Sequence, residues 1–191
     1  MGMRVFKRTF DLLGASFLLM ILSPLFLMVA IAIRLTSKGP VIYWSNRVGQ
    51  ENRIFRMPKF RSMQTDTPLA PTHLLEDGNR YLTPIGSFLR RTSIDELPQL
   101  WSIFKGDMSF VGPRPVLFNQ DDLNEMRTEA GVHHLRPGLT GWAQINGRDE
   151  LSTPEKVAYD REYKERQSLL FDFQIILRTV GKIVRQEGIQ H

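Results

Sequence analysis

Residues 12–33, LLGASFLLMILSPLFLMVAIAI, form the longest apolar run of the chain and contain no charged side chain. It is bounded by Asp11 and Arg34. A straight helix of this length would extend about 30 Å, which is enough to cross the hydrocarbon core of a membrane. The stretch therefore predicts a membrane segment close to the N-terminus.

Two features argue against a simple membrane span. Basic residues lie on both flanks, namely Arg4, Lys7, Arg8, Arg34 and Lys38, so neither end is favoured to cross. Ser23 and Pro24 lie at the midpoint of the run. Pro24 has no N–H to donate to the carbonyl of Met20, so the helix kinks or breaks there. The Ser23 hydroxyl can bond to a backbone carbonyl and sharpen the bend. We favour a re-entrant helix–break–helix that enters one leaflet and returns, and a kinked transmembrane helix is the alternative. The run is too long for a typical cleaved signal peptide.

The composition excludes several classes of protein. With 191 residues, 42% of them hydrophobic and 24% charged, the chain is neither disordered nor fibrous. The absence of cysteine excludes disulfide scaffolds, thiolate metal sites and cysteine nucleophiles. The net charge of +5 comes from residues 1–66, where 10 basic and 3 acidic residues accompany the apolar run. An anionic membrane surface is the natural partner of that combination.

The remaining residues predict alternating short elements. We expect strands at 41–44 and 54–55, helices at 86–91, 97–104, 117–129, 153–167 and 169–184, a surface loop at 64–83, and irregular structure at 110–115 and 134–148. Thr153 is the expected N-cap of the fourth helix, with Pro154 at its first position. The last helix gathers apolar residues on one face: Leu169, Leu170, Phe173, Ile176, Leu177, Val180 and Val184. That face is typical of a buried core helix, or of an amphipathic helix at a membrane interface.

Adjacent carboxylates at Asp95 and Glu96 open an apolar helical segment in SIDELPQL, residues 93–100. One interpretation is structural, because Ser93 and Glu96 have the spacing of a capping box and acidic residues stabilise helix N-termini. The other is chemical, because neighbouring carboxylates can act as a nucleophile and a metal ligand. The helix N-terminus is expected to keep both carboxylates ionised, which suits Mg²⁺ binding or attack at phosphorus.

Basic residues that could hold phosphate oxygens lie in glycine-rich, proline-rich or tightly patterned segments: Lys59, Arg61, Arg90, Arg91, Arg114 and Arg148. Arg114 is fixed between Pro113 and Pro115, so its guanidinium loses less entropy when it clamps an oxyanion. Each alone is typical of a solvated surface charge, but together with the acidic pair they indicate a phosphoryl-transfer site. Zinc is not expected, because the histidines lack metal-ligand spacing: His73, His133, His134 and His191.

Four motifs carry a resemblance to a known family. They are KFRSM (59–63), LRRTSIDELPQL (89–100), DMSFVGPRP (107–115) and RPGLTGWAQ (136–144). In this order they resemble the bacterial sugar transferases, and more closely the small monotopic polyprenyl-phosphate phosphoglycosyl transferases, from about Lys7 to the C-terminus. The long N-terminal extension of larger members has no counterpart, so the chain is expected to be the catalytic core alone.

The resemblance implies a two-step transfer. Asp95 would attack the β-phosphorus of a UDP-sugar, release UMP and carry a phospho-sugar that undecaprenyl phosphate then accepts. It implies Mg²⁺ at Asp95 and Glu96, although Glu96 could instead position the incoming phosphate. By resemblance the sugar is an N-acetylated amino or diamino sugar rather than glucose or galactose.

The resemblance also assigns the basic residues. The positions that match the family's cations around the phosphates are Lys59, Arg90 and Arg114, and weaker matches are Arg61, Arg91 and Arg148. Asp160 falls in a segment similar to the family's, and a helix-surface charge is its alternative interpretation.

The fold implied by the resemblance is α+β and mostly helical. Residues 1–38 would form the re-entrant membrane helix, broken at Ser23 and Pro24, and residues 39–191 a compact cytosolic catalytic domain with interfacial amphipathic helices. The enzyme would lie on the cytoplasmic face of the bacterial inner membrane, bind no nucleic acid and start O-antigen, capsule, exopolysaccharide or glycoprotein glycan synthesis. A catalytically inactive scaffold for glycan-assembly enzymes is the alternative. Homo-oligomers and complexes with downstream glycosyltransferases both stay open.

Overall fold

The computed structural model describes residues 2–67, 78–147 and 150–185, and within them the fold is α+β and mostly helical, as predicted. The helices are α1 (Gly2–Ile21), α2 (Ser23–Thr36), α3 (Gly86–Arg91), α4 (Leu100–Lys105), α5 (Asp121–Glu129), α6 (Trp142–Ile145), α7 (Thr153–Arg166) and α8 (Leu169–Arg185). The strands are β1 (Ile42–Val48), β2 (Ile54–Phe60), β3 (Ser109–Val111), β4 (Val116–Leu117) and β5 (Gly138–Thr140). Short 3₁₀ helices are η1 (Gln50–Asn52), η3 (Gly78–Tyr81), η4 (Ile94–Gln99) and η5 (Val132–His134).

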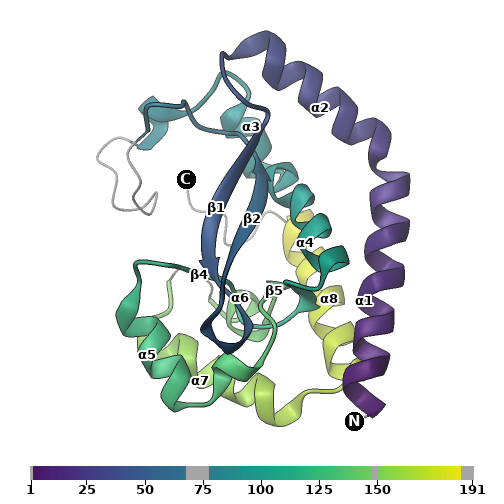
Figure 1. Cartoon of the computed structure of the whole chain (residues 1–191), viewed down its shortest axis with the longest axis vertical. Coiled ribbons are helices and arrows are strands. Elements are labelled where there is room, and N and C mark those ends of the chain that lie inside the picture. The colour runs from purple at the N-terminus through teal and green to yellow at the C-terminus, as the bar shows by residue number, and fades with distance from the viewer. Residues whose placement is uncertain (1, 68–77, 148–149, 186–191) are drawn as a thin grey trace.

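Helices α1 and α2 form a bent arm along one side of the molecule, with the β1–β2 hairpin in the middle and α5 and α7 at one end (Figure 1). The predicted break at Ser23 and Pro24 is confirmed, and the Ser23 hydroxyl donates to the carbonyl of Met20 at 2.8 Å. Taken singly, none of the described helices has the length and apolarity needed to cross a membrane. The pair Val5–Ile21 and Ser23–Thr36 passes that test together, with a bend of 59°.

Helix α1 is tied to the rest of the chain through a buried polar network. Lys7 Nζ lies 2.5 Å from Asp172 Oδ2 on α8 and 3.0 Å from the carbonyl oxygen of Val111 on β3. The Tyr163 hydroxyl on α7 donates to Asp172 Oδ1 at 2.7 Å. One lysine near the N-terminus therefore joins α1 to three elements that are distant in sequence.

Two further side chains of α1 face the same way. Arg8 donates to the carbonyls of Ile103 and Phe104 at 2.6 and 2.7 Å, and so satisfies the C-terminal carbonyls of α4. Asp11 Oδ1 accepts the backbone N–H of Phe110 at 3.1 Å. The first three turns of α1 are thus held by α4 and β3 as well as by α8.

The strands differ from the prediction in length and in number. Strands β2, β1 and β4 form an antiparallel sheet in that order, while β3 and β5 pair in parallel. Strand β1 extends to Val48, so Arg47 lies in the sheet, beyond the strand predicted at 41–44. Pro58 lies within β2, which is tolerated because β2 is an edge strand.

The prediction of irregular structure at 110–115 and 134–148 was wrong in part. Residues 109–111 form β3, and the second segment contains β5 and α6. The two strands have three residues each and pair at Ser109 with Gly138 and at Val111 with Thr140. Such short strands have no local alternation to reveal them, because their order comes from a partner about 30 residues away.

Helix α8 does not pack against the core with the face on which the predicted apolar residues gather. It packs with roughly the opposite face. Phe171 and Ile175 are buried against the cluster around Tyr163. The gathered apolar residues of the other face are largely exposed: Leu169, Leu170, Phe173, Leu177 and Val180. The interpretation of this face as core is therefore wrong, and α8 exposes an apolar stripe.

Helix α7 begins with Ser152 as its N-cap, one residue before the predicted Thr153. Glu155 Oε2 accepts the backbone N–H of Ser152 at 2.8 Å, which forms half of a capping box. Pro154 keeps its place in the first turn.

Candidate active site

The acidic pair lies on η4, between α3 and α4. Ser93 has a left-handed backbone, with φ of 55°, and its side chain makes no capping hydrogen bond. Pro98 cannot donate to the carbonyl of Ile94, so the segment does not continue as a regular α-helix. The capping-box interpretation of Ser93 and Glu96 is wrong, because the Glu96 side chain turns to partners on other elements.

Glu96 joins three parts of the chain. Its Oε1 lies 2.7 Å from Lys59 Nζ on β2 and 3.3 Å from Arg114 Nη2 in the β3–β4 loop. All three side chains are at least partly buried, so the ion pairs are screened less than surface pairs. Two cations predicted as phosphate ligands thus converge on one predicted catalytic carboxylate.

Asp95 is buried, with 7% of its surface exposed, and accepts no hydrogen bond from the described residues. Burial raises the pKa of its carboxyl to about 6, and the negative charge of Glu96 acts in the same direction. The positive charges of Lys59, Arg90 and Arg114 oppose this rise. Desolvation therefore outweighs the favourable charges, but a carboxyl with a pKa of about 6 is still mostly ionised at pH 7.

Of the other predicted cations, Arg90 belongs to this cluster. Its Nε donates to the Ser62 hydroxyl at 3.1 Å, and its charge acts on Asp95. Burial lowers the pKa of Arg90, and the nearby Asp95 counteracts that effect.

Arg61 turns away from the acidic pair. It donates to the carbonyl oxygens of Ser37 and Lys38, which joins the end of β2 to the end of α2. Arg91 is exposed on α3, and Arg148 lies outside the described residues. Of the five predicted cations that the structure describes, three therefore belong to the cluster around the acidic pair.

The segment Pro113–Arg114–Pro115 is held at each of its carbonyls. Pro113 accepts the backbone N–H of Gly138 at 2.9 Å, Arg114 accepts from Arg127 Nη1 at 2.8 Å, and Pro115 accepts from Arg47 Nη1 at 3.3 Å. Two prolines restrict the backbone, and three hydrogen bonds fix it in space. The Arg114 side chain is thus presented to Glu96 from a rigid support.

Asp160 contacts Arg127, the residue that holds the Arg114 carbonyl. It is 1% exposed, and its Oδ2 accepts from Arg127 Nε at 2.9 Å and Nη2 at 2.5 Å. The surface-charge interpretation of Asp160 is therefore wrong. Asp160 orients the guanidinium that holds the Arg114 carbonyl.

Arg47 is a residue of this region that the sequence reasoning missed. It lies half-buried on β1, and its Nε donates to the Ser45 hydroxyl at 3.0 Å. The pKa of Arg47 is lowered to about 10, mainly by burial and also by the charge of Arg114, while Glu96 opposes both effects. If the strand predicted at 41–44 had been extended to Val48, the alternation of side chains along it would have placed Tyr43, Ser45 and Arg47 on one face.

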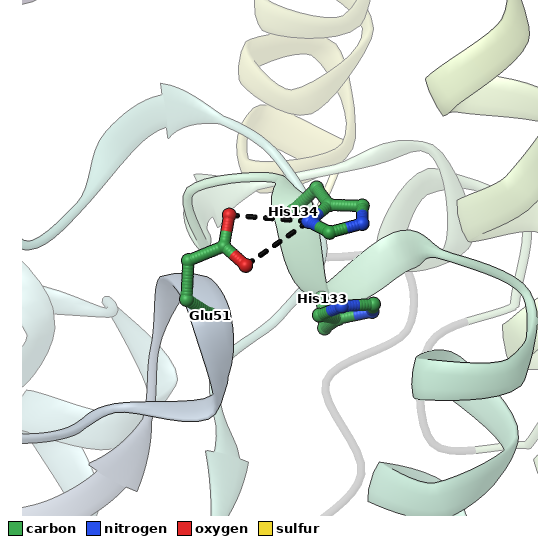
Figure 2. A group of neighbouring side chains, drawn as sticks. All are labelled: Glu51, His133 and His134. Carbon is green, nitrogen blue, oxygen red and sulfur yellow. Dashed lines mark hydrogen bonds and ion pairs between the residues drawn. The ribbon is translucent and has the colours of Figure 1, made fainter.

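A second group, Glu51, His133 and His134, offers three ligand atoms within 4.8 Å of one another. Sequence spacing could not indicate this group, because Glu51 comes from η1 and the two histidines come from η5. Figure 2 shows the Glu51 carboxylate facing His134, with Nδ1 of His134 at 3.0 and 3.1 Å from the two oxygens. No such bond joins Glu51 to His133, and Glu51 and His134 are about half exposed. We interpret the group as a contact between the β1–β2 turn and η5, not as a metal centre.

The oxygens of Asp95 and Glu96 suit a different ion. Carboxylates are the ligands that Mg²⁺ prefers, and the two adjacent residues bring them to one place. Since no described donor bonds to Asp95, its oxygens can accept a cation. The donor set therefore fits Mg²⁺.

Taken together, these side chains can perform chemistry on a phosphate ester. The Asp95 carboxylate, which accepts no hydrogen bond from a described residue, could act as a nucleophile, and the nearby cations could hold phosphate oxygens and stabilise charge on a leaving group. Among the described residues, Arg47, Lys59, Arg90 and Arg114 each act electrostatically on Asp95 or Glu96, so the region attracts anions.

Comparison with known proteins gives a consistent result. The profile of the family described as bacterial sugar transferase matches residues 2–186. The chain is 42% identical to the uncharacterized sugar transferase EpsL of Bacillus subtilis over 186 residues, which cover 97% of this chain and 91% of EpsL. It is 43% identical to the undecaprenyl-phosphate glucose phosphotransferase of Komagataeibacter xylinus, over 92% of this chain and 35% of that protein.

A third relative carries a different sugar in its name. The UDP-N-acetylgalactosamine-undecaprenyl-phosphate N-acetylgalactosaminephosphotransferase of Aeromonas hydrophila is 39% identical over 95% of this chain and 44% of its own length. The chain thus spans nearly all of EpsL and less than half of the two relatives whose names state a reaction.

Proposed function

The chain belongs to the bacterial sugar transferase family, and from this premise we propose that it transfers a phospho-sugar from a UDP-sugar to undecaprenyl phosphate. The names of relatives support both the donor class and the lipid acceptor. Our proposal for the sugar is an N-acetylated amino or diamino sugar, with release of UMP. The product would start the assembly of a surface glycan.

The observation that carries this proposal is the state of Asp95. A buried carboxylate with no hydrogen bond from the described residues, and with a pKa of about 6, costs folding free energy. Such a cost is typical of active sites, where pKa values are tuned to the reaction. The nearby cations Lys59, Arg90 and Arg114 make phosphate the natural substrate group.

In the first proposed step, an Asp95 carboxylate oxygen attacks the β-phosphorus of the UDP-sugar. A bond forms between that oxygen and phosphorus, and the bond from phosphorus to the bridging oxygen breaks. UMP leaves with the bridging oxygen and its electron pair. Lys59 and Arg114 would stabilise the phosphate charge, while Arg90 would favour the ionised form of Asp95.

In the second step, a phosphate oxygen of undecaprenyl phosphate attacks the same phosphorus. The bond from phosphorus to Asp95 breaks, the carboxylate is restored, and undecaprenyl diphosphate sugar leaves. Glu96 is held by Lys59 and Arg114, and so would orient these two cations through both steps.

Asp95 and Glu96 would hold the Mg²⁺ that the resemblance implies, and the ion would supply charge neutralisation for the phosphates when bound. The carboxylates would in turn fix where that charge lies relative to Lys59 and Arg114.

We further propose that the bent arm of α1 and α2 enters one leaflet of the bacterial inner membrane from the cytoplasmic face. The supporting observations are the 59° bend and the basic residues at both ends of the apolar run. The exposed apolar stripe of α8 would lie at the same interface, which corresponds to an amphipathic helix on a membrane surface. The lipid phosphate would then meet the donor at the membrane surface.

The test is the intact mass of the full chain in detergent, after incubation with Mg²⁺ and a panel of UDP-sugars but no lipid acceptor. The panel includes glucose, galactose and N-acetylated amino and diamino sugar donors. A sugar-phosphate adduct on the wild type, absent from Asp95→Asn, is the expected result. Asp107→Asn is the matched control, because Asp107 is a partly exposed carboxylate just after α4.

Other outcomes separate the alternatives. UMP release that requires undecaprenyl phosphate and leaves no adduct would indicate direct displacement, and would contradict the covalent step. Neither adduct nor UMP across the whole panel, with or without lipid, would contradict the transferase proposal and favour an inactive scaffold.

A further inference from the structure

We propose that Arg47 is a substrate-binding residue, whose guanidinium holds a diphosphate oxygen of the nucleotide donor beside Arg114. The inference rests on the proposed function and deepens it, because it adds a donor-binding residue from β1 to a site predicted from η4, β2 and the β3–β4 loop. Arg47 would carry no bond-making step. Its contribution would be to donor affinity.

The first argument is the way the guanidinium is fixed. Its Nε donates to Ser45 at 3.0 Å and its Nη1 donates to the carbonyl of Pro115 at 3.3 Å. Within the described residues, Nη2 has no acceptor. One edge of the planar group is therefore anchored to the protein, and the remaining donors are available to an anion at little entropic cost.

The Arg47 side chain also lies on the same face of the β1–β2 hairpin as Lys59. In the β1–β2 ladder, Tyr43 lies opposite Lys59 and Arg47 lies opposite Phe55, so Arg47 and Lys59 share one face of the hairpin. Lys59 reaches Glu96 from that face. Arg47 is close enough to Glu96 and Arg114 for both charges to act on it.

The third argument is electrostatic. Arg47 is half-buried and feels the like charge of Arg114, which Glu96 opposes. Like charges placed together repel unless an anion joins them. A diphosphate oxygen would stabilise the charge of Arg47, because the planar guanidinium matches phosphate oxygens.

A purely structural role is the competing explanation, since Arg47 also supports the carbonyl of Pro115. The two explanations differ in their response to phosphate. A structural arginine affects the binding of uridine and of UDP alike, because both depend on the fold. A phosphate ligand affects UDP alone.

The experiment measures the affinity of the full chain for UDP and for uridine by calorimetry, in wild type, Arg47→Gln and Arg56→Gln. Arg56 is the matched control, because it lies on β2 of the same hairpin, is exposed and stacks over Trp44. We expect Arg47→Gln to weaken UDP binding by about 10–100-fold, the range of one charged hydrogen bond, and to leave uridine binding unchanged. Unchanged UDP affinity, or an equal loss for both ligands, would overturn the proposal.

A measurement on the wild type covers the case in which Arg47→Gln does not fold. A dicarbonyl reagent modifies accessible arginines, and mass spectrometry of peptides gives the rate at each position. UDP is expected to slow modification of Arg47 several-fold, while uridine does not and Arg56 reacts equally throughout. An unchanged rate at Arg47 under saturating UDP would overturn the inference.

The two proposals can fail separately. Neither measurement needs turnover, so selective protection by UDP would stand even if no sugar-phosphate adduct formed. Conversely, adduct formation with normal UDP affinity in Arg47→Gln would refute this inference and leave the transferase proposal intact.

Discussion

Two regions of the molecule each bury an aspartate, but they differ in whether hydrogen bonds stabilise the charge of its carboxylate. On α7, Asp160 receives two hydrogen bonds from Arg127. On η4, Asp95 is nearly as buried but accepts none from the described residues, although three cations act on it from nearby. Burial raises the pKa of both carboxyls, and only at Asp160 does a hydrogen-bonded partner directly oppose the rise.

The difference distinguishes a supporting aspartate, Asp160, from the proposed catalytic aspartate, Asp95. The bonds of Asp160 fix Arg127, which in turn fixes the carbonyl of Arg114. The oxygens of Asp95 remain available to a reacting group, and the free-energy cost of that arrangement is borne by the fold. If this comparison holds, equal substitutions at the two aspartates will have opposite effects on stability and different effects on activity.

The largest expected effect is the loss of activity in Asp95→Asn. An amide cannot act as the nucleophile, so adduct formation and UMP release should fall by on the order of 10⁴-fold or more. Removing the buried charge should at the same time raise the free energy of unfolding at pH 8 by about 1–3 kcal/mol. Mass spectrometry and urea unfolding in detergent measure the two quantities. A variant that loses activity because it unfolds more easily would contradict the assignment.

Asp160→Asn should have the largest effect on stability. It leaves the Arg127 charge buried without a full partner, and breaking such a pair costs about 3–5 kcal/mol. Urea unfolding at pH 8 checks the value. The matched control is Glu165→Gln, which removes an exposed pair with Arg161 on the same helix. A cost at Asp160 no larger than that of the control would show that the two buried regions do not differ as proposed.

The pH dependence should show the raised pKa of Asp95. Only the ionised carboxylate attacks phosphorus, so adduct formation should fall about tenfold per pH unit below a midpoint near 6. The proton is bound more tightly in the folded state than in the unfolded state. The destabilisation from Asp95 is therefore complete above about pH 6 and absent below the ordinary pKa of 3.8.

Measurement of unfolding from pH 4 to pH 8 tests this sign. The stabilisation of Asp95→Asn relative to wild type should grow as the pH rises and disappear near pH 4. A midpoint of activity near 4 would mean that Asp95 is an ordinary carboxylate, and would remove the contrast with the rest of the chain.

The smallest expected effect concerns Glu51→Gln. Its ion pair with His134 joins two elements but is about half exposed, and such pairs contribute less than about 1 kcal/mol. Urea unfolding should therefore change little, and adduct formation not at all. A large loss of either would show that this contact has a function beyond joining η1 to η5.

Much of the arrangement could be predicted locally. The break at Ser23 and Pro24 follows from the chemistry of proline, and α3 matches its prediction at both ends. Asp95, Glu96, Lys59 and Arg114 were identified because their motifs are specific, and the structure brings them together.

Other features depend on partners that are distant in sequence. Arg61 and Lys59 are two residues apart on one motif, yet one turns to α2 and the other to η4. The sequence left open whether the apolar face of α8 is buried in the core or lies at a membrane interface, because an amphipathic pattern does not say whether that face meets protein or lipid. Arg47 was missed because the length of β1 depends on its pairing with β2 and β4.

Three features could be predicted from residue order alone: a proline-broken apolar arm, a mixture of helices and short strands, and a set of acidic and basic residues suited to phosphate chemistry. These follow from local sterics, hydrophobic pattern and residue type. Only the tertiary structure decided which carboxylate received hydrogen bonds and which did not. The reason is physical, because desolvation and ion pairing depend on what surrounds a charge in space, and the neighbours of Asp95 and Asp160 come from elements that are distant in the chain.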